Sequence, residues 1–155
     1  MIEREIEFYD YGYDGEGVGK AGGKIIFVPC TLRGEIADVE LTKKTSSFCK
    51  GRVVRLLCES PERQIPPCPY FGICGGCAFQ HTSYSNELEI KKQLLSKQLD
   101  KVGYNSEITV VQSPLEYGYR NKIKLFVGDG AVGLKEKSSD RVVDIDNCKI
   151  ASPMI

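Results

Sequence analysis

Four cysteines have the type and spacing needed to bind a metal centre. Cys68, Cys74 and Cys77 follow one another at C-x5-C-x2-C spacing, and Cys148 lies far downstream in the segment 146–150. Thiolates are the ligands of both iron–sulfur clusters and structural zinc. Zinc sites usually pair two short cysteine knuckles, and only Cys74 and Cys77 form one here. The spacing therefore favours an iron–sulfur cluster, and it leaves zinc, a disulfide or unrelated thiols open.

The residues around the first three cysteines predict a tight loop. Gly72, Gly75 and Gly76 lack a Cβ, so the backbone can turn sharply and its amides can point at sulfur. Pro66 and Pro67 precede the loop, and they prevent a helix or a central strand from running into it.

The motif that surrounds these cysteines resembles the uracil-C5 RNA methyltransferases. Residues 66–84 read PPCPYFGICGGCAFQHTSY, and Glu89-x-Lys91-Lys92 follows. The segment around Cys148 is similar to the one that carries the family's fourth cluster ligand, and residues 119–122 are similar to its Tyr-Arg-rich segment. The resemblance covers essentially the whole chain.

The resemblance implies a TRAM domain, a 4Fe-4S cluster and a methyltransferase that uses S-adenosyl-L-methionine. It implies that Cys68, Cys74, Cys77 and Cys148 hold the cluster, with zinc as the alternative. Members of the family methylate C5 of a uridine after a cysteine attacks C6. The expected partner is RNA, ribosomal RNA before transfer RNA.

The family's catalytic cysteine, general base and S-adenosyl-L-methionine domain lie C-terminal to the matched region, and no position here matches them. We therefore expect no catalytic residue in this chain and no methyltransferase activity from it alone. The chain stops at residues 151–155 without a polar tail, and we expect a further domain beyond. The alternative is a free-standing iron–sulfur or zinc module that binds RNA or transfers electrons.

Composition limits the partners. The 155 residues contain 21 Lys plus Arg and 21 Asp plus Glu, so the net charge of zero excludes a strongly basic RNA binder. No apolar run is long enough for a membrane span, and the charged N-terminus has no signal-peptide core. We expect a cytoplasmic protein, a monomer that keeps its seven cysteines reduced.

Residues 1–59 predict a mainly β unit, a small OB-like barrel, and the resemblance implies that it is a five-stranded barrel of TRAM type. Strand-like runs alternate with Gly-rich turns, as at 25–28, 35–43 and 49–58. Residues 17–22 contain a formal G-x-G-x-x-G, but a strand follows it where a dinucleotide site needs a helix, so we predict a strand–turn–strand. Three further cysteines are predicted to be small buried hydrophobic residues: Cys30, Cys49 and Cys58.

Lysine and arginine side chains are the candidate RNA contacts, with Tyr11 and Tyr13 as stacking faces. The candidates are Lys20, Arg33, Lys43, Lys44, Lys50, Arg52, Arg120 and Lys122. Each of them is also consistent with an ordinary solvated surface residue.

Residues 60–67 are predicted to be a linker, and residues 68–155 a small α+β iron–sulfur region that is incomplete. A helix is expected from Ser83 to Val102, ended by Gly103 and with an apolar stripe that docks on a neighbour. His81 is expected to be a polar residue at the loop-to-helix junction. Strands are expected at 108–111, 119–127, 131–135 and 141–145, with a hairpin turn at Asp129-Gly130.

Overall fold

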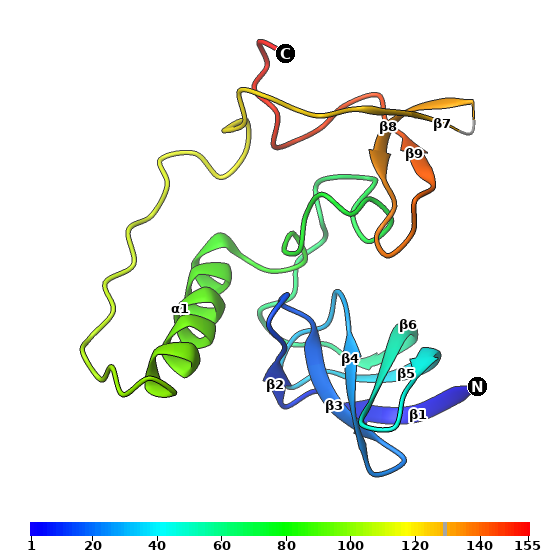
Figure 1. Cartoon of the computed structure of the whole chain (residues 1–155), viewed down its shortest axis with the longest axis vertical. Coiled ribbons are helices and arrows are strands. Elements are labelled where there is room, and N and C mark those ends of the chain that lie inside the picture. The colour runs from blue at the N-terminus through cyan, green and yellow to red at the C-terminus, as the bar shows by residue number, and fades with distance from the viewer. Residues whose placement is uncertain (129) are drawn as a thin grey trace.

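The computed structural model describes residues 1–128 and 130–155, and its architecture is mainly β. A curved six-stranded sheet lies at one end of the molecule and a three-stranded sheet at the other, with one helix beside them (Figure 1). The first sheet contains β1 (Ile2–Glu7), β2 (Asp10–Tyr11), β3 (Gly17–Ala21), β4 (Lys24–Val28), β5 (Ile36–Lys44) and β6 (Phe48–Cys58). The rest comprises α1 (Tyr84–Asp100), β7 (Phe126–Gly128), β8 (Ala131–Lys135) and β9 (Val142–Asp144).

The first sheet is a half-barrel with the strand order β1-β5-β6-β4-β3-β2. Its two edge strands, β1 and β2, are consecutive in the chain. Between them, Phe8 donates its N–H to the Glu35 oxygen (3.0 Å) and Tyr9 donates its N–H to the Val18 oxygen (3.0 Å). The chain thus crosses from one edge of the sheet to the other. This sheet has six strands where five are expected from the sequence, because the two-residue β2 pairs with β3 as a separate strand.

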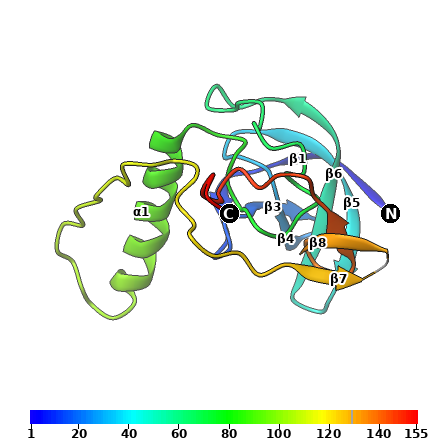
Figure 2. The same ribbon diagram turned by 90° about the horizontal axis from the view of Figure 1, so that it is seen from above.

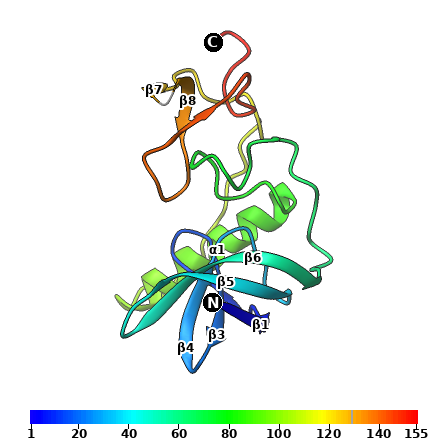
Figure 3. The same cartoon turned by 90° about the vertical axis from the view of Figure 1, so that its right-hand side faces the viewer.

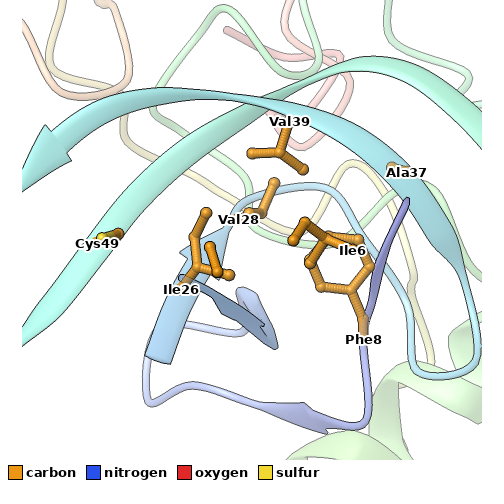
Figure 4. Packing of buried hydrophobic residues seen from close by; sticks show 8 residues of the cluster. Ile6, Phe8, Ile26, Val28, Ala37, Val39 and Cys49 are labelled. Atoms are coloured by element: carbon orange, nitrogen blue, oxygen red, sulfur yellow. The ribbon is translucent and has the colours of Figure 1, made fainter. Parts of the chain in front are cut away.

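Alternating apolar residues of these strands form the core inside the curve. Ile6 and Phe8 meet Ile26, Val28 and Val39 there (Figure 4). Phe8, Ile26, Val28 and Val39 are completely buried, whereas Ile25, which precedes Ile26 in β4, is exposed on the other face. The burial of these side chains is the main stabilising contribution in this half of the chain.

The glycine-rich segment is a β-hairpin, as predicted. β3 and β4 pair in register from Gly17↔Val28 to Ala21↔Lys24. Gly22 and Gly23 connect them with φ of 54° and 78°. A two-residue turn with positive φ at both positions matches the twist of the strands, and glycine adopts it without strain. The dinucleotide interpretation is therefore excluded by the fold.

The helix α1 agrees with the predicted boundaries. Ser83 is its N-cap and accepts a hydrogen bond from the Asn86 N–H (3.3 Å), and Gly103 follows its end with φ of 77°. The prediction that an apolar stripe of this helix docks on a neighbour is wrong in part. Ile90 is the one buried residue of α1, whereas Leu95 and Val102 are exposed by 48% and 77%. Figure 2 shows α1 lying beside the sheets.

One of the expected strands does not form, and a second forms only at its end. Residues 108–111 have no strand, and of the segment 119–127 only 126–127 lie in one, β7. A strand needs a neighbour to accept its ladder, and no ladder partner for 108–111 exists among residues 1–128 and 130–155. β8 has its predicted bounds, and β9 is a shorter version of the strand expected at 141–145.

β7, β8 and β9 form an antiparallel sheet in that order, at the far end from the half-barrel (Figure 3). Gly128 pairs with Ala131, so the predicted hairpin between β7 and β8 exists. Asp129 of the predicted turn lies outside the described residues. The segment after β9 brings Cys148 toward the cysteine loop.

Candidate metal centre

The four cysteines that the sequence singles out line one cavity. Cys68, Cys74 and Cys77 reach it from the loop 68–77, and Cys148 reaches it from the segment after β9. All four side chains are half-buried. The other lining residues come from the same two parts of the chain and from β8: Tyr70, Phe71, Gly76, Gln80, Leu134, Ile145, Asn147, Lys149 and Ile150.

Backbone hydrogen bonds hold the cysteine loop against the end of β8. Gly75 donates its N–H to the Lys135 oxygen (2.9 Å), and Lys137 donates to the Ile73 oxygen (2.8 Å). A Cβ on Gly75 would lie 3.2 Å from the Lys135 oxygen, so glycine permits this close approach. The loop is therefore positioned by a strand that is distant in sequence.

Tyr70 and Asp146 join the loop directly to the Cys148 segment. The Tyr70 hydroxyl donates to Asp146 Oδ2 (3.1 Å), and it accepts a hydrogen bond from the Asp146 N–H (3.1 Å). Tyr70 lies two residues after Cys68, and Asp146 lies two residues before Cys148. This pair of hydrogen bonds brings the fourth cysteine to the other three.

The thiol of Cys77 responds to its three neighbours. Burial raises its pKa, a hydrogen bond with the Gln80 side chain opposes the rise, and Cys148, Cys74 and Cys68 raise the pKa further. Four thiolates at this place repel one another, so ligation by a cation is what would stabilise the charged forms.

The four cysteines line a small cavity of about 20 Å³. Among residues 1–128 and 130–155, no three His, Cys, Asp or Glu side chains are grouped as one metal ion would require. The Gly76 N–H donates to Cys74 Sγ (3.3 Å), and the buried Gln80 amide also lines the cavity. Four thiols with N–H donors near sulfur are a donor set for an iron–sulfur cluster or for zinc.

His81 lies in an aromatic stack behind the cysteine loop. Its ring is 1% exposed and lies 5.4 Å from Phe71 and 6.2 Å from Phe79, measured between ring centroids. Neither ring nitrogen has a hydrogen-bond partner in the described part of the chain. Burial, and then the nearby Arg63 guanidinium, lower its pKa from 6.5 to about 4. His81 lies at the loop-to-helix junction as predicted, but it is a buried packing residue there.

A buried ion pair connects the half-barrel to the cysteine loop. The guanidinium of Arg63 binds both carboxylate oxygens of Glu35, at 2.5 and 2.7 Å, and also donates to the Cys30 oxygen (2.9 Å). Arg63 forms a β-bridge with Thr82, just after the loop. The segment 60–67, which is expected to be a linker, is therefore bound both to the half-barrel and to the residues that follow the cysteine loop.

An open cleft of about 780 Å³ adjoins the cysteine cavity on the side of α1. Phe79, Tyr84, Tyr117 and Tyr119 give it aromatic walls, and Cys77 and Gln80 line both spaces. The Tyr84 hydroxyl accepts a hydrogen bond from the Ser113 N–H (3.0 Å), which holds the extended segment against the helix. Aromatic side chains in the lining of this cleft offer stacking surfaces for bases.

The predicted RNA contacts do not form one surface. Four lysines lie on the strands near one end of the half-barrel, whereas Arg33 lies beyond the opposite end of β4 and donates its N–H to the Tyr11 hydroxyl (3.0 Å). Arg52 forms an ion pair with Glu40, with 2.6 Å between nitrogen and oxygen. Arg120 and Lys122 lie in the extended segment before β7. The four lysines at the first end are Lys20, Lys43, Lys44 and Lys50.

The remaining cysteines differ in burial. Cys49 is buried in the core as predicted. Cys30 is half-buried and Cys58 is exposed, so the prediction of buried residues is wrong for Cys58 and only partly right for Cys30. Cys58 is the last residue of β6, where the strand leaves the core.

Comparison with known proteins places these features in context. Residues 3–54 match the family model described as the TRAM domain. The chain is 37% identical to 23S rRNA (uracil(1939)-C(5))-methyltransferase RlmD of Francisella tularensis subsp. novicida, over 97% of this chain and 36% of the relative. It is 31% identical to an uncharacterized RNA methyltransferase of Aquifex aeolicus, over 92% of this chain and 34% of that protein.

A solved structure is similar along almost the whole chain. The Pyrococcus abyssi tRNA (uracil-54, C5)-methyltransferase, in complex with S-adenosyl-L-homocysteine, superposes with a TM-score of 0.71 at 27% identity. The match covers 97% of this chain and 33% of that one. This chain therefore spans about a third of the length of the proteins it matches. No helix among the described residues is long and apolar enough to cross a membrane.

Proposed function

We propose that this chain, which corresponds to the N-terminal, TRAM-containing part of RNA uracil-C5 methyltransferases, binds RNA for such an enzyme. The proposed reaction of the whole protein is methylation of C5 of a uridine, in ribosomal or transfer RNA, with S-adenosyl-L-methionine as donor. The chain contributes no catalytic residue to it. A cytoplasmic monomer is proposed, as is an OB-like TRAM unit at residues 1–59.

We assign a 4Fe-4S cluster to Cys68, Cys74, Cys77 and Cys148. The observation that carries this proposal is that all four cysteines, 80 residues apart at the extremes, line the same cavity. When bound, the cluster would link the loop 68–77 to the Cys148 segment by metal–thiolate bonds. Closing so long a loop stabilises a region with a small core, so we propose a structural role.

The protein's own residues prepare this site. The Tyr70–Asp146 hydrogen bonds and the Gly75–Lys135 hydrogen bond set the distance between the two cysteine segments. The Gly76 amide and the Gln80 side chain supply donors to sulfur. Zinc on the same thiols is the alternative, and metal analysis separates the two.

The proposal is tested with the purified chain, S-adenosyl-L-methionine labelled in its methyl group, and ribosomal and transfer RNA transcripts. We expect the chain to retain RNA on a filter and to transfer no label to it. Methylated uridine would contradict the assignment to a non-catalytic part. Absence of RNA retention at low salt would contradict the RNA-binding role, irrespective of the metal content.

A further inference from the structure

Two hairpin ends meet at one pole of the half-barrel. The turn between β3 and β4 and the turn between β5 and β6 are joined by Lys24, whose Nζ donates to the Thr45 oxygen (2.8 Å). Figure 1 and Figure 3 both place these ends on the side of the half-barrel away from β7, β8 and β9. Residues 20 and 50, which are distant in sequence, thereby belong to one surface.

Lysines gather at this pole without carboxylates. The ranges 17–34 and 41–58, which form both hairpin ends, contain no Asp or Glu, although the whole chain has equal numbers of acidic and basic residues. None of the lysines there forms an ion pair within the described ranges. We call these lysines the hairpin-end patch: Lys20, Lys24, Lys43, Lys44 and Lys50.

Two of these lysines oppose each other directly. Lys43 of β5 is the cross-strand partner of Lys50 of β6, and both side chains are exposed. Like charges at directly opposed positions destabilise an antiparallel pair. A bound polyanion would remove this repulsion, so the arrangement is suited to phosphate groups.

Apolar surface lies between the lysines. Phe48 is the cross-strand partner of the exposed Ile25, and its ring packs edge-to-face on Phe27 with 6.0 Å between centroids and 79° between planes. Both phenylalanine rings are half-buried, so part of each faces solvent. The sequence pattern indicates four of the five lysines of this surface, all except Lys24, but it does not indicate these aromatic residues.

The charge changes sign across β5. The edge strand β1 on its other side carries Glu3, Glu5 and Glu7, and Glu40 of β5 neutralises Arg52. A polyanion is therefore directed toward the hairpin ends and away from β1.

We propose that the hairpin-end patch binds unpaired RNA, with its lysines on phosphates and Phe48 and Ile25 against bases. The inference rests on the proposed RNA-binding function and adds the location and the strandedness of the contact. Single-stranded RNA is favoured because stacking on an aromatic face requires an unpaired base, while lysines beside it contact the backbone.

The test measures fluorescence anisotropy of a labelled 12-nucleotide single strand and of the same sequence in a duplex, over a series of salt concentrations. The variant K43Q/K50Q removes the opposed pair, and K92Q/K101Q, in α1 and at its C-cap, makes the same change in net charge. We expect K43Q/K50Q to bind the single strand about tenfold more weakly and to lower the salt slope by about 1.4, at 0.7 per phosphate contact. We expect K92Q/K101Q to match the parent chain.

Folding and function are separated by thermal melts of the same proteins. Removing the Lys43–Lys50 repulsion should leave the melting temperature of K43Q/K50Q equal or higher, while RNA affinity falls. Binding by K43Q/K50Q at the parent affinity would overturn the patch and leave RNA binding elsewhere intact. A preference for the duplex would overturn the single-strand mode. Failure of the parent chain to bind either RNA would overturn both the patch and the proposed function.

Discussion

The carboxylate of Glu35 is fully buried and is bound at both oxygens by the guanidinium of Arg63, with Nε–Oε1 at 2.5 Å and Nη2–Oε2 at 2.7 Å. The Leu32 and Ser60 amides donate to the same carboxylate at 2.8 and 3.2 Å. Glu35 precedes β5, and Arg63 lies between β6 and the cysteine loop. This pair therefore fixes how the cysteine loop leaves the half-barrel.

Removing one partner of this pair should be costly. The substitution Arg63→Met leaves the Glu35 charge buried and unpaired, so we expect a loss of about 3–5 kcal/mol in unfolding free energy, measured by urea denaturation. The exposed Arg52–Glu40 pair provides the control, since R52M should cost less than about 1 kcal/mol. Equal losses in the two variants would contradict the account.

Stability should depend on pH through His81. The folded pKa of about 4 lies below the ordinary 6.5, so the folded state disfavours the charged imidazole. The contribution of the neutral imidazole to the unfolding free energy is complete above pH 6.5. It is lost as the pH falls toward 4, with about 2 kcal/mol lost at pH 5. The variant His81→Phe should remove this part of the slope in denaturation series at pH 7 and 5. A slope identical to that of the parent chain would show that His81 is not the group responsible.

The Tyr70 hydroxyl should slow the loss of metal. Tyr70→Phe removes both exposed hydrogen bonds to Asp146, which contribute about 0.5 kcal/mol each and about 1 kcal/mol together, so iron release to a chelator should accelerate roughly fivefold. The control is Tyr13→Phe, because Tyr13 is 81% exposed and lies on the half-barrel. Unchanged release in Y70F would contradict a positioning role for this residue.

Cys148→Ser should unfold one part of the chain and spare the other. Amide hydrogen exchange should show lost protection after about Pro66, while β3, β4 and β6 keep theirs because their core contains none of the four ligands. Cys58→Ser serves as the matched control, since Cys58 is exposed and outside the cavity. Full protection after Pro66 in C148S would show that the cluster is not structural.

Local signals in the sequence predict much of this fold. The Ser83 cap and Gly103 give the helix bounds, and the two glycines 22 and 23 give the β3–β4 hairpin. The cysteine spacing selects the residues that line one cavity. These features depend on neighbours in sequence or on one residue type, which pattern analysis detects.

Features that depend on tertiary contacts are not predicted. The Glu35–Arg63 pair joins residues 28 apart, and neither side chain carries a local sign of burial. Residues 108–111 have a strand-like composition, but composition does not provide the hydrogen-bonding neighbour that a strand needs. The Lys43–Lys50 opposition depends on a register that includes irregular steps between Leu41 and Lys43.

We propose that Cys68, Cys74, Cys77 and Cys148 together hold one iron–sulfur cluster. The most direct test is iron, sulfide and zinc analysis of the chain purified without oxygen, together with C148S and C58S. We predict about four irons and four sulfides per parent chain and per C58S chain, and a large loss of both in C148S. One zinc per colourless chain, or full iron in C148S, would contradict the claim.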